Sequence, residues 1–292
     1  MERQLWKEIV RIISQFSKQP FNPRHRFTDD DIIEVYFWAV IHDRPVSWAC
    51  ERINWGIWWR KKRLPSNTTM SRRLRKASVR ERIAELEKRV LRSPDAGLVW
   101  FVDGKPLVIS GCSKDKQAGY GRATGGKAKG YKLHAIVGND DSIAEWRLAP
   151  MNVDERKMAR RMLLVADIQG YLAADGNYDS NELHAICDER GNLQLVSPRR
   201  YGPQSGTGHR KQTPGRMRSK DILENPSPAF GADLMAQRVA IERHYGNLSN
   251  WGGGLTHLPP WARGYRRVHR WVQAKLIVNA VRRLTKSTTC AA

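Results

Sequence analysis

Two aspartates each follow a short run of apolar residues and each precede a glycine. Asp103 comes after residues 98–102, and Asp175 comes after residues 171–174. Unbroken apolar runs of this length are typical of buried strands, and neighbouring parallel strands deliver their C-terminal ends to the same edge of a sheet. We therefore expect the two carboxylates to lie close together. Hard divalent cations prefer carboxylate oxygens, and two such ions about 3.5–4 Å apart can promote phosphoryl transfer.

Glu242 is the candidate for a third carboxylate. No acidic residue follows it, whereas basic residues continue almost to the end of the chain: Arg243, Arg263, Arg266, Arg267, Arg270, Lys275, Arg282, Arg283 and Lys286. A single glutamate at the border of this basic segment is well placed to meet both a metal ion and a phosphate. The alternative is an intrahelical ion pair with Arg238, which contributes only about 0.2–0.5 kcal/mol. The pattern leaves both interpretations open.

The other potential metal ligands fit different roles. Asp140 and Asp141 lie in a turn between two expected strands. Asp154 and Glu155 begin an expected helix, where acidic side chains are favourable. The cysteines are far apart and form no CxxC pair: Cys50, Cys112, Cys187 and Cys290. This spacing argues against a zinc ribbon or a disulfide framework, so we expect ordinary reduced thiols.

The charge of the chain implies a polyanionic partner. Lysines and arginines number 51 against 29 aspartates and glutamates, which gives a formal net charge of +22 and an isoelectric point near 10.3. Such a charge destabilises a compact fold unless a partner neutralises it, and nucleic acid is the leading candidate. A ribosomal-type protein or a membrane-surface protein would satisfy the same charge. Charge therefore does not choose an activity by itself.

Hydropathy indicates a cytoplasmic protein without a membrane partner. The mean hydropathy is −0.60, and no apolar run approaches the roughly 18 residues that would span a bilayer. The first residues carry no signal-peptide pattern. We therefore expect the chain to stay in the cytoplasm.

Residues 1–95 are expected to form a helical DNA-binding domain. Apolar residues recur at helical spacing over 5–16 and 32–40, and Thr28 supplies an N-cap for the second helix. The stretch 64–75 has a loop, capping hydroxyls and then a short basic helix, the arrangement of a helix-turn-helix recognition helix. This helix carries Arg72, Arg73 and Arg75, which contact DNA or, alternatively, form a solvated face. Four tryptophans are interpreted as core residues: Trp48, Trp55, Trp58 and Trp59.

Residues 96–292 are expected to form a catalytic domain of the α/β class, with a ribonuclease-H-like mixed sheet and flanking helices. The expected strands lie at 98–102, 107–109, 131–137, 143–148, 171–174 and 193–196, with helices over 152–166, 180–189 and from 230 past Glu242. Residues 119–127 read as a flexible basic loop and 198–228 as a mobile basic loop. A basic amphipathic helix over 268–284 completes this domain.

Four segments in this order resemble one known family. They are VWFVDGKP at 99–106, GGKAKGYKLH at 125–134, LAADGNYD at 172–179 and RVAIER at 238–243. Together they are similar to the DDE transposases of bacterial insertion sequences, in the superfamily of insertion sequences four and five. The ordered set is more specific than any single segment and spans most of residues 97–285.

The resemblance implies a metal-dependent reaction on DNA. By position, Asp103, Asp175 and Glu242 would hold two Mg²⁺ ions, for which Mn²⁺ would substitute, with Asp103 bridging both. The implied chemistry is cleavage of a DNA strand at the end of the element, followed by attack of the freed 3′-hydroxyl on target DNA. The implied partners are double-stranded DNA, as inverted-repeat ends and target, and a second copy of the chain on paired ends, in association with a bacterial nucleoid.

A DNA strand at this site also needs cations that border the acids. The candidates for backbone contacts are Lys127, Lys129, Lys132 and Arg238.

The resemblance is incomplete in one signature. Some members of the family have a tyrosine three residues before the arginine and a lysine seven residues after the glutamate, where this chain has Met235 and Ser249. A hairpin intermediate on the excised end, which goes with that signature, is therefore not carried over. Two rival functions stay open: a ribonuclease-H-like DNA nuclease without strand transfer, and a DNA-binding relic without catalysis.

Overall fold

The chain folds into two compact units. The computed structural model describes residues 1–17, 26–56, 63–92, 97–110, 113–200, 212–224, 229–250, 254–255 and 257–290. One unit comprises residues 1–91 with 247–292, and the other comprises residues 92–246. We expected the C-terminal helix in the catalytic domain, but it belongs to the helical unit.

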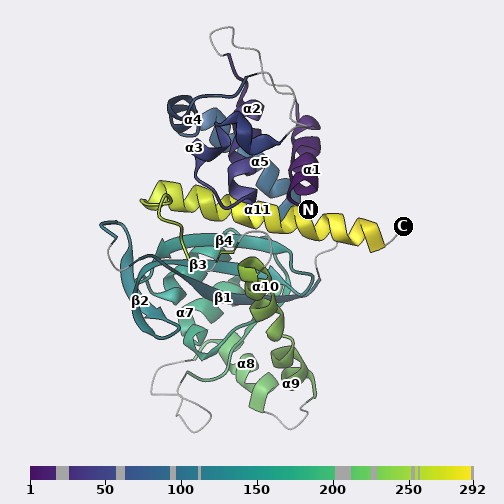
Figure 1. Cartoon of the computed structure of the whole chain (residues 1–292). Coiled ribbons are helices and arrows are strands. Elements are labelled where there is room, and N and C mark those ends of the chain that lie inside the picture. The colour runs from purple at the N-terminus through teal and green to yellow at the C-terminus, as the bar shows by residue number, and fades with distance from the viewer. Residues whose placement is uncertain are drawn as a thin grey trace. The chain divides into compact units, whose positions relative to one another are not determined.

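Helices make up the first unit (Figure 1). They are α1 (Glu2–Ser14), α2 (Asp29–Ile41), α3 (Val46–Ala49), η1 (Arg52–Trp55), α4 (Asn67–Arg73), α5 (Ala77–Leu91) and α11 (Tyr265–Cys290). The expected N-cap of α2 is confirmed, because the Thr28 side chain accepts a hydrogen bond from the Asp31 amide while the Asp31 carboxylate accepts one from the Thr28 amide. This capping box fixes the start of the helix.

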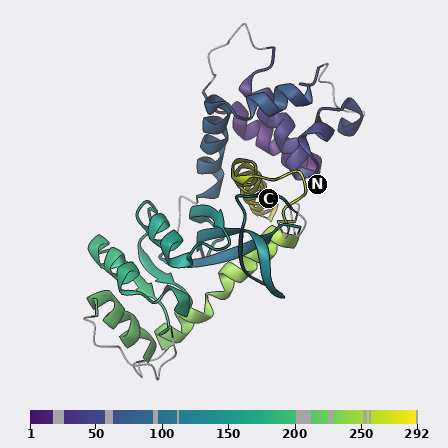
Figure 2. The same ribbon diagram turned by 90° about the vertical axis from the view of Figure 1, so that its left-hand side faces the viewer.

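The long helix α11 lies against α1, α2 and α5, as both views show (Figures 1 and 2). The Lys275 ammonium is buried and donates hydrogen bonds to the Val40 carbonyl at 2.8 Å and to the Asp43 carboxylate at 2.6 Å. These contacts join residues more than 200 positions apart in the sequence, which explains why local pattern assigned α11 to the other domain. No helix in the described part of the chain is both long and apolar enough to cross a bilayer.

The core of the helical unit contains a tryptophan cluster. The rings of Trp38 and Trp55 stack with centroids 4.8 Å apart, and Trp6 meets both edge-on. All three are buried. The interpretation of tryptophans as core residues is therefore confirmed at Trp55, whereas Trp58 and Trp59 lie outside the described residues.

The second unit is built on a mixed sheet of six strands. Its elements are β1 (Val99–Val108), β2 (Gly119–Ala123), β3 (Gly126–Gly138), β4 (Ile143–Pro150), α6 (Glu155–Leu163), β5 (Gly170–Ala173), η2 (Gly176–Tyr178), α7 (Asn181–Arg190), β6 (Leu193–Val196), α8 (Pro214–Glu224), α9 (Ala229–Ala236) and α10 (Val239–Asn250). β3 pairs antiparallel with β1 and β4, while β1, β5 and β6 run parallel. This confirms the expected ribonuclease-H-like strand order and fold class.

The segment 119–127, expected to be a flexible loop, instead forms the strand β2 and the turn into β3. Gly125 and Gly126 make the turn with φ values of 90° and 120°, which side chains larger than glycine rarely adopt. Gly121 packs against the adjoining chain so closely that a Cβ atom there would lie 2.4 Å from the Met151 carbonyl oxygen. Close backbone approach, rather than apolar patterning, thus makes this glycine-rich segment a hairpin.

The expected mobile loop 198–228 contains the helix α8. Pro214 occupies its first position, where the missing amide costs nothing. The Gln194 side chain donates to the Gly215 carbonyl at 2.9 Å, and Ser219 bonds to Ser197 at the end of β6. Because polar contacts rather than an apolar stripe hold this helix, hydrophobic periodicity does not reveal it.

Two of the cysteines have thiols that resist ionisation. Cys50 and Cys187 are free, and burial raises their pKa values to about 11 and about 12. Both therefore stay protonated at neutral pH. Cys112 lies outside the described residues.

Candidate metal and nucleic-acid site

Asp103 and Asp175 occupy equivalent positions on adjacent parallel strands. Phe101 of β1 stands opposite Ala173 of β5, and each aspartate follows two residues later. The structure thus brings the two predicted carboxylates to one place. β1 does not end at Asp103 as expected but continues to Val108, because its second half still pairs with β3.

Hydrogen bonds hold the main chain at both aspartates. The Tyr245 hydroxyl of α10 donates to the Asp103 carbonyl at 2.8 Å, and the Ser197 hydroxyl donates to the Asp175 carbonyl at 2.6 Å. The Asp175 carboxylate also accepts from the Asn177 amide at 2.9 Å, as the N-cap of η2. The main chain at each aspartate is therefore held by a residue outside its own strand.

The carboxyl group of Asp103 has a raised pKa. Its pKa is about 6, mainly because of burial; the negative charges of Asp175 and Glu155 add to the rise, while a hydrogen bond from the Gly104 amide and the charge of Arg238 oppose it. Burial and neighbouring acids thus make the ionised form of Asp103 costly. A cation between the carboxylates would lower that cost.

The acid pair fits a hard divalent cation by donor chemistry, since carboxylate oxygens are the ligands that Mg²⁺ accepts. In the structure, this set of metal ligands is incomplete. Within the residues that the structure describes, no group of three or more histidine, cysteine, aspartate or glutamate side chains is close enough to hold one ion. The structure brings Asp103 and Asp175 together, whereas Glu242 is not part of this group.

That third carboxylate is Glu242, on the first turn of α10. Its side chain is 65% exposed, and its nearest cation is the Arg238 guanidinium at 3.8 Å, in the i to i+4 arrangement. The ion pair that the sequence offered as an alternative is therefore the geometry observed. The face of α10 that is buried carries Ile241 and Tyr245 instead.

Glu155 is a further acid at the site. The sequence analysis assigned this residue only to the start of a helix. It is indeed the first residue of α6, next to the N-cap Asp154. Its carboxylate also forms an ion pair with Lys132 of β3, and its charge acts on Asp103. No local pattern distinguishes it from an ordinary residue of a first helical turn, because its role arises from the packing of α6 on the sheet.

A pocket of about 800 Å³ opens beside the two aspartates. The tip of the β2–β3 hairpin, the start of α6 and Arg200 line it, together with Gly104 and Asn177, the immediate neighbours of the acid pair. Lys132 also lies in this lining, as expected for a residue bordering the acids.

The other two predicted lysines lie on the β2–β3 hairpin. Lys127 and Lys129 place their ammonium groups 5.9 Å and 6.0 Å from the centre of the Tyr120 ring. Lys129 also donates to the Ser113 carbonyl at 3.1 Å. Both therefore rest against the hairpin rather than against the carboxylates.

The three predicted arginines of the helical unit differ in environment. Arg73 is only 4% exposed, and its guanidinium bonds the Asp29 carboxylate and, at 2.9 Å, the Phe27 carbonyl. It joins α4 to α2 and does not present its charge at the surface. Arg72 is exposed and lines a second pocket of about 600 Å³, whereas exposed Arg75 donates to the Ser71 carbonyl at 2.9 Å.

Comparison with known proteins identifies the family. A solved structure, the piggyBac transposase in a synaptic complex with hairpin DNA, is similar with a TM-score of 0.47 and 11% identity, over 95% of this chain and 71% of that chain. No curated protein shows significant similarity to the chain. A family model described as the transposase DDE domain matches residues 95–278, a range that includes both aspartates and Glu242. The chain therefore belongs to the family of transposases with a DDE domain.

Proposed function

We propose that this transposase cleaves DNA at the ends of a mobile element and joins the freed 3′ end to target DNA by metal-dependent phosphoryl transfer. One observation carries the proposal: Asp103 and Asp175 stand at equivalent positions on adjacent strands, with the pKa of Asp103 raised to about 6. Such a pair suits a divalent cation, which prefers carboxylate oxygens. The family membership supports DNA as the substrate.

In this proposal the carboxylates of Asp103 and Asp175 hold two Mg²⁺ ions, or Mn²⁺ in their place, and Glu242 completes the set. Glu242 would exchange its ion pair with Arg238 for the metal site, a rearrangement that its exposed position permits. When bound, the ions would supply Lewis acidity at the scissile phosphate and lower the pKa of the attacking water. The protein's own part is to fix the aspartates through Tyr245 and Ser197.

The net charge of +22 supports double-stranded DNA as the partner. We propose backbone contacts from Lys127, Lys129, Lys132 and Arg238 in the catalytic unit, and from Arg72 of α4 and Arg75, which follows α4, in the helical unit. We do not include Arg73 among the proposed DNA contacts, because its guanidinium is buried against Asp29. The proposed working form is a homodimer on paired element ends, in the cytoplasm of a bacterial cell.

The test is a combined cleavage and joining assay with the full chain. DNA from the inverted repeats that flank the gene is end-labelled and incubated with target DNA, with Mg²⁺ or with EDTA. The proposal requires nicked ends and joined products in Mg²⁺ and neither in EDTA. Nicking without joined products would support the nuclease alternative. Binding without any metal-dependent nicking would support the non-catalytic alternative.

A further inference from the structure

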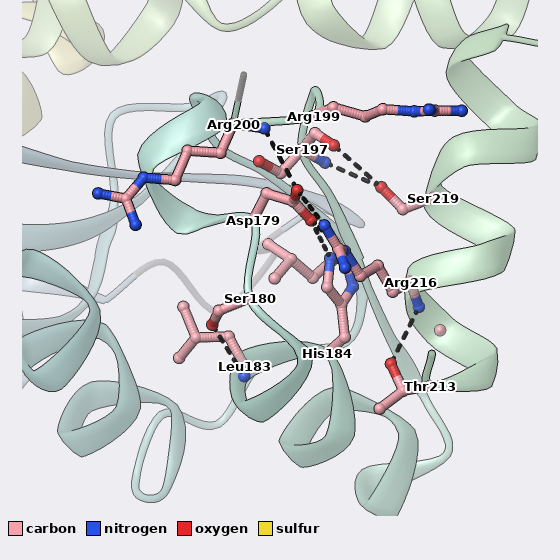
Figure 3. A network of polar contacts seen from close by, with 12 residues as sticks. Asp179, Ser180, Leu183, His184, Ser197, Arg199, Arg200, Thr213, Arg216 and Ser219 are labelled. Carbon is pink, nitrogen blue, oxygen red and sulfur yellow. Dashed lines mark hydrogen bonds and ion pairs between the residues drawn. The ribbon is translucent and has the colours of Figure 1, made fainter. Parts of the chain in front are cut away.

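Two consecutive arginines that follow β6 point in opposite directions (Figure 3). Arg199 turns toward α8, where its Nε atom lies 2.6 Å from a carboxylate oxygen of Glu224. Arg200 turns away from α8, and its side chain is exposed and lines the 800 Å³ pocket beside the acid pair. The chain thus directs one of two identical side chains into the pocket.

Asp179 holds the main chain from which the Arg200 side chain extends. The Arg200 amide donates to the Asp179 carboxylate at 3.3 Å. Arg216 of α8 donates to both oxygens of that carboxylate, at 2.7 Å from Nε and 2.7 Å from Nη2. Such bidentate pairing holds a carboxylate in one orientation. Figure 3 shows these contacts converging on Asp179.

Asp179 stays ionised in this arrangement. Burial alone would raise its pKa, but the nearby His184 ring and the hydrogen bonds and charge of Arg216 outweigh burial and hold the pKa well below its usual value. The His184 ring lies 3.6 Å from the carboxylate. The acceptor for the Arg200 amide is therefore a fixed charge.

The same short segment also supports Asp175. The Ser197 hydroxyl donates to the Asp175 carbonyl at 2.6 Å, and the Ser197 amide donates to the Ser219 hydroxyl of α8 at 3.0 Å. Residues 197–200 therefore connect Asp175 at one end with Arg200 at the other. This connection holds the main chain of Arg200 close to the acid pair.

The pocket lining has a surplus of positive charge. Among the described residues, it contains four cations, Arg122, Lys132, Arg156 and Arg200, and two acids, Asp154 and Glu155, which gives a net charge of +2. Lys132 pairs with Glu155, and Arg156 pairs with Asp154 at 2.9 Å. Arg122 on the hairpin and Arg200 after β6 bring two further guanidinium groups to the same lining.

We propose that Arg200, together with Arg122, binds a backbone phosphate of the DNA strand next to the one that reacts at Asp103 and Asp175. Asp179 is the positioning residue that places Arg200 for this contact. Guanidinium groups suit phosphate because their donors match its oxygens. The inference rests on the proposed function and deepens it by naming the residues that hold the DNA at the acid pair.

The test compares Arg200→Gln with Arg199→Gln, which removes the same charge one residue away. Affinity for a duplex carrying the element end is measured by fluorescence anisotropy in EDTA over a series of salt concentrations. Arg200→Gln should weaken binding about fivefold and reduce the slope of log affinity against log salt by about 1, the value for one lost phosphate contact. Arg199→Gln should keep the wild-type slope, and Arg200→Lys should restore most of it.

Asp179→Asn tests the positioning role by the same readout. This variant should lose the same slope as Arg200→Gln, and the double variant should lose no more than either single one, because both changes remove one contact. Additive losses would overturn the role of Asp179. Equal slopes for Arg200→Gln and Arg199→Gln would overturn the phosphate contact itself, even where wild-type cleavage still depends on Asp103. Failure of the wild-type chain to bind the duplex would overturn the proposed function and this inference together.

Discussion

The Tyr245 hydroxyl donates a hydrogen bond to the Asp103 carbonyl at 2.8 Å, which ties the helix carrying Glu242 to the strand carrying the first aspartate. Tyr245 is buried, so loss of its hydroxyl leaves that carbonyl without this donor. Tyr245→Phe should lower the free energy of unfolding by about 1–2 kcal/mol and reduce metal-dependent cleavage. Urea denaturation and a cleavage time course measure the two effects. Unchanged values in both would show that this hydrogen bond does not hold the site.

Glu242 and Glu155 are the two candidates for the third carboxylate of the metal site. Glu242 is exposed and paired with Arg238, whereas Glu155 already acts on Asp103 and pairs with Lys132. The proposal requires Glu242→Gln to slow cleavage more than about a hundredfold, since it removes a metal ligand worth several kcal/mol. Glu155→Gln should slow it less. The opposite ranking, in assays with saturating Mg²⁺, would assign the role to Glu155.

Stability without metal should depend on pH through Asp103. Its pKa is raised from 3.8 to about 6, so the folded state binds more protons than the unfolded state between these values. The free energy of unfolding should therefore fall as pH rises through this window. In EDTA at about pH 7, Asp103→Asn should be more stable than the wild type by about 2 kcal/mol.

Urea denaturation at several pH values with EDTA, repeated with Mg²⁺, measures this effect. Mg²⁺ should stabilise the wild type more than Asp103→Asn. The raised pKa of Asp103 would be contradicted if the wild-type free energy of unfolding did not change between pH 3.8 and about 6. It would also be contradicted if that free energy rose with pH as much as it does in Asp103→Asn.

Two neighbouring arginines of α4 should separate stability from DNA binding. Arg73 and Asp29 form a buried ion pair, with 4% and 8% exposure. Arg73→Gln should therefore cost about 3 kcal/mol of stability by leaving Asp29 buried without its partner. Arg72→Gln should stay within about 0.5 kcal/mol of the wild type but weaken DNA binding. Thermal unfolding and anisotropy distinguish these outcomes, and equal stability of the two variants would contradict this division of roles.

The sequence predicts the acid pair because local signals suffice there. Apolar runs mark β1 and β5, and parallel pairing brings the residues after them together. The same reasoning predicts the β3–β4 hairpin, since both strands contain enough apolar residues to be recognised from the sequence. In the second unit, the expected order of the other strands is confirmed, whereas β2 was not predicted.

Other features depend on contacts that sequence patterns do not contain. α11 joins the helical unit through Lys275 and residues far away in the chain, and α8 is held by polar contacts with β6. Arg73 resembles its exposed neighbours in sequence, yet it lies opposite Asp29 after folding. Glu155 likewise reaches the site only because α6 packs on the sheet. In each case tertiary placement, rather than residue type, decides the role.

In the proposed function, Asp103 makes this transposase a metal-dependent DNA-cleaving enzyme. Cleavage of inverted-repeat DNA in Mg²⁺ is measured for the wild type, for Asp103→Asn and for Glu182→Gln, which removes an exposed acid of the same unit that pairs with Arg160. The wild type and Glu182→Gln should cleave the DNA and Asp103→Asn should not, although all three should bind it. Cleavage by Asp103→Asn at the wild-type rate would show that Asp103 does not hold the catalytic metal.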